Sequence, residues 1–179
     1  MADIFVLEAI QKFLQDNVTS KFKLQQKTNN INNYALITPS VHIGWIPPKL
    51  PEGWTTEEQV PDIPCAIIGM DEGEDSGDEA GINIRITFVV YSPGLHEPKE
   101  SGGLKFTPDF IGYEDLLNFI NRTKLEIARK QIIGITTLQG PFKWGMYQEQ
   151  PYPYWYGWLT FRARTKPSQY VPGIIDQYL

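Results

Sequence analysis

Residues 144–164 read WGMYQEQPYPYWYGWLTFRAR, and this stretch decides the fold because it contains a strand with two different faces. It holds four Tyr, three Trp and one Phe, most of them close to a Pro-Tyr-Pro hinge at residues 151–153. After the hinge the side chains alternate with the period of two that is typical of a half-buried strand. One set is apolar: Trp155, Leu159, Phe161 and Ala163. The other set is aromatic and basic: Tyr156, Trp158, Thr160, Arg162 and Arg164.

The aromatic and basic set has the composition of a protein contact surface. Tyr, Trp and Arg contribute large contact areas with polar tips, and they are enriched where proteins bind one another. A well-packed edge strand with exposed rings would show the same composition. The pattern therefore predicts a strand with one core face and leaves both explanations of the other face open.

The overall composition narrows the class of protein. The chain has 179 residues, with 16 Lys and Arg against 21 Asp and Glu, a formal net charge of -5. Nucleic acid and anionic membranes both require a concentrated positive field, so neither is expected as a broad partner. The single cysteine, Cys65, excludes an internal disulfide and a cysteine-based zinc site. The length predicts one domain over residues 1–179, with long loops at about 47–64 and 92–109.

Neither end of the chain nor its interior shows a membrane signal. Residues 1–10 carry Asp3 and Glu8 and lack the basic and apolar regions of a signal peptide. No segment has the apolar length that spans a bilayer. We therefore expect a soluble protein made in a cytoplasm.

The first third of the chain predicts one helix and two strands. Residues 4–17 have apolar side chains at helical spacing, with Asp3 placed as a cap. Residues 19–33 are polar and could be a hairpin, an irregular connection or a mobile segment. Residues 34–37 and 41–46 predict short strands. The proline-rich residues 47–64, which include Trp54, predict a surface loop or a loop that docks on a neighbour.

The middle of the chain predicts two strands separated by acids. Residues 65–70 form an apolar run that fits a buried strand, and residues 82–90 alternate cleanly enough for a central strand. Between them, residues 71–79 read DEGEDSGDE, which does not match the spacing of a calcium-binding loop. This segment predicts a solvated loop or an acidic patch that a partner's Arg or Lys recognises.

The rest of the chain predicts a second helix and further strands. Residues 92–109 are interrupted by Pro and Gly and predict a long connection. A helix starts near residue 112, with apolar side chains on one stripe and its charges ordered to suit the helix dipole. Residues 132–138 could be a strand or a loop, and residues 141–148 predict another strand before the hinge.

No catalytic motif accompanies these elements. The sequence lacks the common nucleotide-binding, serine hydrolase and zinc-protease patterns. His42 and His96 have no recognisable partner motif, and both are interpreted as ordinary surface or core histidines. The clustered acids stand among glycines, which is a poor way to fix two carboxylates for catalysis. We therefore predict that the protein is not an enzyme and has no cofactor and no metal site.

Several short motifs, taken together, resemble one known family. They are the first helix, the HIGWIPP strand end at residues 42–48, residues 64–70 with the acids 72–76, the GYEDLL helix start at residues 112–117, and EQPYPYW at residues 149–155 with the strand that follows. As a set they are similar to tail terminator, or tail completion, proteins of phages and prophages of Gram-positive bacteria. The resemblance spans most of the chain.

The resemblance implies a fold and a structural role. The fold would be α+β, with a mostly antiparallel sheet packed against two main helices. Six copies would form a ring on the head-proximal end of the tail tube, in the virion tail or neck, after assembly in the host bacterial cytoplasm. Implied partners are a homo-hexamer, the tail tube protein, the neck connector or stopper protein and the tail sheath, with genomic DNA only passing through the lumen.

A head-to-tail ring needs two unlike surfaces on each subunit. The acidic segment 71–79 and the strand 156–164 are the predicted pair. The predicted interface residues are Trp54, Asp71, Glu72, Glu74, Asp75, Tyr152, Tyr154, Tyr156, Trp158, Arg162 and Arg164. The alternatives are another neck component such as a head-tail stopper, a carbohydrate-binding module using exposed rings, and a single-strand nucleic-acid binder, which the charge balance disfavours.

Overall fold

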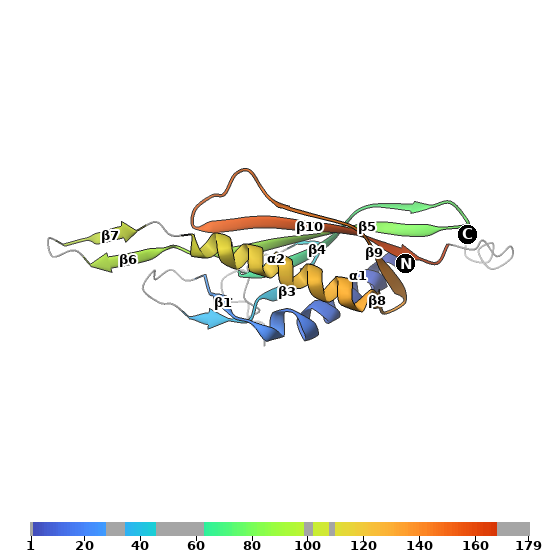
Figure 1. Ribbon diagram of the computed structural model, residues 1–179, viewed down its shortest axis with the longest axis horizontal. Coiled ribbons are helices and arrows are strands. Elements are labelled where there is room, and N and C mark those ends of the chain that lie inside the picture. The colour runs from blue at the N-terminus through green and yellow to red at the C-terminus, as the bar shows by residue number, and fades with distance from the viewer. Residues whose placement is uncertain (1, 28–34, 46–62, 99–101, 108–109, 168–179) are drawn as a thin grey trace, which may run out of the picture.

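The structure, a computed structural model, describes residues 2–27, 35–45, 63–98, 102–107 and 110–167, and these residues form an α+β fold. Helices α1 (Ala2–Asn17) and α2 (Ile111–Lys130) lie on the same side of a six-stranded sheet (Figure 1). The strand order is β3-β4-β5-β10-β9-β8, and among the described strands only β3 and β4 pair in parallel. The predicted mostly antiparallel sheet with two main helices is therefore confirmed.

The large sheet is built from long central strands and short outer ones. Its members are β3 (Ser40–Ile43), β4 (Cys65–Asp75), β5 (Ala80–Tyr91), β8 (Ile132–Ile133), β9 (Thr136–Met146) and β10 (Tyr154–Thr165). Two small sheets stand apart from it: β1 (Leu24–Gln25) with β2 (Leu36–Ile37), and β6 (Leu95–Pro98) with β7 (Leu104–Thr107). A single 3-10 turn, η1 (Thr19–Lys21), follows α1. The β6–β7 hairpin extends beyond the rest of the molecule (Figure 1).

One apolar core lies between the helices and the sheet. Every second residue of β5 faces it, because side chains alternate along a strand. Phe88 is fully buried and meets the ring of Phe119 from α2 edge-to-face at 4.8 Å. The buried members contributed by the two helices are Val6, Ile10, Leu14, Leu116, Phe119, Ile120 and Ile127. This shared core holds both helices on one face, which we call the helix face; the opposite face is called the second face.

Three predictions about elements were wrong. Residues 71–75 do not form a loop, because β4 continues through Asp75 before the turn to β5. Residues 92–109 are not one irregular connection, because they contain the β6–β7 hairpin. The alternative of β10 as an edge strand fails as well, because β10 lies between β5 and β9. The acids remain in a strand because polar partners on β5 and β10 stand within reach of them.

The remaining predictions differ from the structure mainly at their boundaries. The predicted strand 41–46 is β3, which ends at Ile43, and the predicted strand 141–148 is β9, which begins at Thr136. Of residues 19–33, the described part contains η1 and β1. The predicted loop 47–64, including Trp54, lies almost wholly outside the described residues.

Candidate interaction surface

Strand β10 divides its side chains between the two faces as the alternation predicts. Leu159, Phe161 and Ala163 are buried on the helix face, and Trp155 packs against the same core. Tyr156, Trp158 and Arg162 are half-buried on the second face, where Arg164 is exposed. Because β10 is central, its second-face side chains have neighbours on both β5 and β9.

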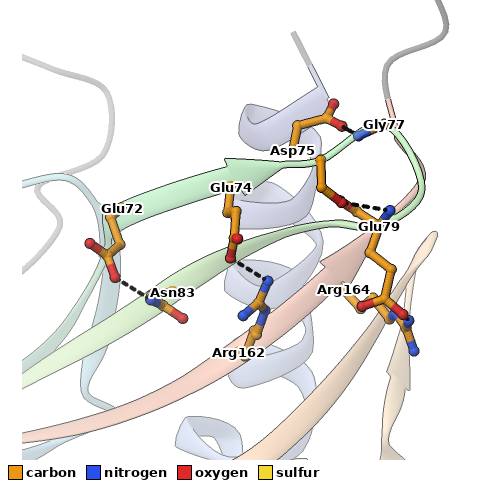
Figure 2. Close-up of polar contacts among 9 residues, drawn as sticks. Glu72, Glu74, Asp75, Gly77, Glu79, Asn83, Arg162 and Arg164 are labelled. Carbon is orange, nitrogen blue, oxygen red and sulfur yellow. Dashed lines mark hydrogen bonds and ion pairs between the residues drawn. The ribbon is translucent and has the colours of Figure 1, made fainter.

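Acids of β4 and the following turn meet arginines of β10 at one end of the second face (Figure 2). Arg162 Nη2 donates to Glu74 Oε2 at 3.1 Å, and Arg164 Nη2 contacts Glu79 Oε1. Asn83 Nδ2 donates to Glu72 Oε1 at 2.8 Å. We call this set the mixed-charge end: Glu72, Glu74, Glu79, Asn83, Arg162 and Arg164. The two patches that were predicted to face each other across a subunit boundary therefore lie side by side in one chain.

A glycine allows this contact between strands that are not neighbours. Glu74 is on β4 and Arg162 on β10, with β5 between them, and Gly81 of β5 is paired with Glu74. A Cβ atom at Gly81 would lie 2.9 Å from Arg162 Nε, so a side chain there would displace the guanidinium. The absence of that side chain leaves a groove of about 310 Å³, lined by Glu72, Gly73, Glu74, Gly81, Asn83 and Arg162.

Arg85 continues the charged region toward the middle of the face. Its Nε and Nη2 donate to the carboxylate of Asp71 at 2.8–3.0 Å, and Asp71 is the extra residue of a β-bulge in β4. The hydrogen bonds that Arg85 donates to Asp71 raise the pKa of Arg85. The guanidinium also lies 5.5 Å from the ring centroid of Trp158, close enough for a cation–π interaction. Trp158 is thus held against Arg85 and does not stand out as a free platform.

The other end of the second face is aromatic and largely buried. Cys65 and Val89 are fully buried there, and Tyr91 stacks obliquely on Tyr154 with ring centroids 5.6 Å apart. Burial raises the pKa of the Tyr156 hydroxyl, and the neighbouring Tyr154 adds to this rise. These contacts make the aromatic end a second, smaller apolar cluster.

The turn between β9 and β10 is fixed by the side chain of Gln150. Its Nε2 donates to the carbonyls of Tyr147 and Tyr156 at 2.6 and 2.9 Å, and its Oε1 accepts from Tyr156 N at 2.6 Å. The Tyr152 hydroxyl donates to the carbonyl oxygen of Pro93, although its side chain remains 55% exposed. The hinge is therefore an ordered turn in which the ring of Tyr152 is exposed.

Helix α2 begins directly against β10. A Cβ atom at Gly112 would overlap the indole of Trp155 and lie 2.7 Å from Ser92 Cβ, so only glycine fits at this helix start. Tyr113 meets the Trp155 ring edge-to-face at 6.2 Å. The Trp155 Nε1 is buried and has no hydrogen-bond partner among the described residues. Packing fixes the position of this indole.

A surface residue that the sequence reasoning did not select is Trp144 on β9. It is 47% exposed, and the Nζ of Lys124 from α2 lies 3.5 Å from its ring centroid. The one sequence feature that could have identified Trp144 as a surface residue was its position inside the aromatic stretch 144–164. The strand that carries it was predicted, but the side of the sheet on which it would lie was not.

The predicted interface residues are thus only partly gathered in one place. Second-face members form two groups, the mixed-charge end and the aromatic end, with Trp158 between them. Tyr152 belongs to the β9–β10 turn, and Trp54 lies outside the described residues. Within the described part of the chain, no group of three or more His, Cys, Asp or Glu is placed to hold a metal ion.

Comparison with known proteins leaves the resemblance without independent support. No model of a known protein family matches the chain, and the search of curated proteins found no match. Among the helices of the described residues, none combines the length and apolarity needed to cross a membrane.

Proposed function

We propose that this chain is a tail terminator of a phage or of a related tail-like particle. In this role, six copies form a ring that closes the head-proximal end of the tail tube, stops its polymerisation and joins it to the neck. The protein would act in the virion through protein contacts, without catalysis. In a particle without a head, the same ring would only close the tube.

The observation that carries the proposal is the contact between motifs on which the family resemblance rests. The helix start at Gly112 packs on Trp155 of the EQPYPYW motif, and Gln150 of that motif clamps the turn before β10. The HIGW strand end pairs with the 64–70 motif, where Gly44 N donates to Ile68 O at 2.8 Å. The motifs therefore have a structural reason to occur together. This favours a fold shared with the family over chance similarity of short sequence motifs.

The distribution of side chains also suits a protein that binds other proteins. Arg, Tyr and Trp side chains, which are common at protein interfaces, are grouped on one face of a sheet and at its margins. The opposite face is covered by helices and supplies the rigid core behind it. A rigid sheet with a polar, aromatic surface can serve as a subunit of an assembly.

The direct test measures tube growth. Purified tail tube protein from the same genome would be allowed to polymerise with and without this chain at a low molar ratio. We expect shorter tubes, each with a ring on one end in electron micrographs. A variant with Phe88→Ala, which removes a fully buried ring, serves as a destabilised control and should cap less well.

Other outcomes would assign the protein elsewhere. Binding only to tubes that are already closed would favour a head-tail stopper. A monomer that ignores tube protein and binds glycans on an array would contradict the proposal and support a carbohydrate-binding module.

A further inference from the structure

The six-stranded sheet has an incomplete strand on each edge. On one edge, β3 pairs only with Cys65–Ile68 of β4, and on the other edge β8 pairs only with Thr136 and Thr137 of β9. No strand among the described residues pairs with the outer side of residues 69–74 in β4 or of residues 139–146 in β9. Exposed edges of this kind offer their backbone N–H and C=O groups to another chain.

These two edges, which the described strands leave unpaired, differ in charge. Residues 69–74 of β4 hold three acids, Asp71, Glu72 and Glu74, and two arginines pair with them: Arg85 with Asp71 and Arg162 with Glu74. The β4 edge therefore keeps an excess of negative charge. Residues 139–146 contain Lys143 and no acid, and Lys124 adds a second cation beside Trp144. The two edges are complementary.

The strand directions also fit. Strands β4, β5, β10 and β9 are successive antiparallel neighbours, so β4 and β9 run in opposite directions. If copies are repeated by rotation about an axis roughly along the strands, β9 of one copy therefore meets β4 of the next antiparallel. Opposite edges of one sheet make a head-to-tail contact, which produces a ring when the rotation closes.

We propose that a second copy of this chain is the occupant of each edge: residues 69–74 of β4 pair with the β9 edge of a neighbouring copy, chiefly at residues 143–146. Pro141 has no N–H group to donate, which is why the pairing is centred beyond it. The inference deepens the proposed ring by naming the two surfaces that join its subunits. It replaces the predicted contact between residues 71–79 and β10 with one between residues 69–74 and β9.

The pairing implies a stagger between subunits. Glu72 lies level with Asn83 of β5, whereas Lys143 lies level with Thr160 and hence with Arg85, two residues further along β5. Joining the two segments shifts each subunit along the strand direction relative to the last. Closed sheets require tilted, staggered strands of this kind.

Disulfide trapping tests the contact directly. Glu72 is paired with Asn83 and Lys143 with Thr160, so both side chains lie on the second face of their strands. Glu72→Cys and Lys143→Cys variants, mixed and oxidised at high protein concentration, should give a covalent dimer. Neither variant should link when oxidised alone, because the contact is head-to-tail. The native Cys65 is buried and should stay unlinked.

The control pairs Glu72→Cys with Leu125→Cys, whose parent side chain is 64% exposed on α2. This pair should link no faster than a random collision. Equal linking by the control pair, or no linking by the edge pair, would overturn the proposal. Linking within single variants would show a symmetric interface and would overturn it as well.

A charge swap tests the complementarity. Lys143→Glu alone and Glu72→Lys alone should each weaken self-association by about tenfold or more, since like charges then oppose one another across the edge. The double variant should recover most of the loss, as measured by sedimentation velocity. Lys12→Glu on the exposed side of α1 is the matched control and should change nothing. A double variant as weak as the worse single variant would count against the proposal.

The two proposals can fail separately. Rings that link through these edges but leave tube growth unchanged would contradict the terminator function and keep the edge contact. Tube capping by a protein that does not link through these edges would keep the function and refute the edge contact.

Discussion

At the scale of single residues, the contact between Gly112 and Trp155 makes the most specific prediction. Gly112→Ala places a methyl group where the indole of Trp155 stands, so either α2 or the ring must move. Overpacking of a buried contact of this kind costs about 1–3 kcal/mol in the free energy of unfolding. Urea unfolding followed by tryptophan fluorescence measures this loss.

Two further variants separate overpacking from the general cost of changing a glycine. Gly69→Ala is the matched control, because a Cβ atom there meets only the Arg85 carbonyl at an ordinary 3.9 Å. It should change stability by much less. Trp155→Phe in the Gly112→Ala background should recover part of the loss, because the smaller ring vacates the space taken by the indole Nε1. A double variant that is no more stable than Gly112→Ala alone would show that the clash is not with this ring.

Such residue-scale roles could not be predicted from the sequence. Gly112 was recognised only as part of a helix start, and Gln150 only as part of a motif near the hinge. The role of each depends on one contact: Gly112 touches a ring more than forty positions away along the chain, and Gln150 bonds to particular backbone groups on both sides of a turn. Local spacing carries no information about either contact. Local spacing did predict the two faces of β10, because the alternation of side chains along a strand is a local property.

At the scale of elements, the two faces of β10 predict opposite outcomes for neighbouring residues. Phe161 is buried among the core side chains, so Phe161→Ala should cost about 3–5 kcal/mol of stability. Arg162 and Glu74 are a solvent-exposed pair, and such pairs contribute about 0–1 kcal/mol. Arg162→Glu should therefore destabilise the fold by far less than Phe161→Ala in chemical denaturation. Similar losses from both changes would refute the assignment of faces.

The elements themselves were predictable where pattern and environment agree. Strands β5 and β10 separate apolar from polar side chains, and α1 buries the stripe that its spacing indicates. Helix α2 buries Leu116, Ile120 and Ile127 of its predicted stripe, whereas Tyr113 of that stripe is exposed. The β4 extension was missed because six acids among glycines resemble a solvated turn. In the structure Asp71, Glu72 and Glu74 are each satisfied by a partner on β5 or β10. The strand order of the sheet decides which strands lie beside an acidic segment. The sequence of the segment alone does not reveal that order.

At the scale of the whole molecule, the candidate site could not be predicted fully either, because it depends on the strand order of the sheet. The acidic and basic segments were both identified, and their charges suggested two separate surfaces. The topology places β4 and β10 on either side of β5, so the charges meet within one chain. The surfaces that we propose to be complementary between copies are the outer edges of β4 and β9. These edges could be located only from the positions where β3 and β8 end.

The arrangement of the molecule also predicts that the β6–β7 hairpin is separable from the fold. The hairpin is a two-stranded sheet of its own and projects beyond the six-stranded sheet (Figure 1). A two-stranded sheet alone is marginally stable in water, so it contributes little to the stability of the rest. Replacing residues 95–107 by a short Gly-Ser linker should shift the midpoint of thermal unfolding by only about 2–4 °C, which corresponds to roughly 1 kcal/mol for a chain of this size.

Replacing the end of the sheet formed by β4 and β5 should have a different result from replacing the β6–β7 hairpin. The β4–β5 end is continuous with the central strands, and its residues pair with β10 as well as with one another. Replacing residues 73–82 by the same linker deletes backbone pairs from three strands at once and removes Ile82, which belongs to the core. We expect a loss of the cooperative transition in calorimetry for this variant only. An equal loss from both replacements would mean that the β6–β7 hairpin is an integral part of the folded unit, and that the stability of the molecule extends beyond the single core between the helices and the sheet.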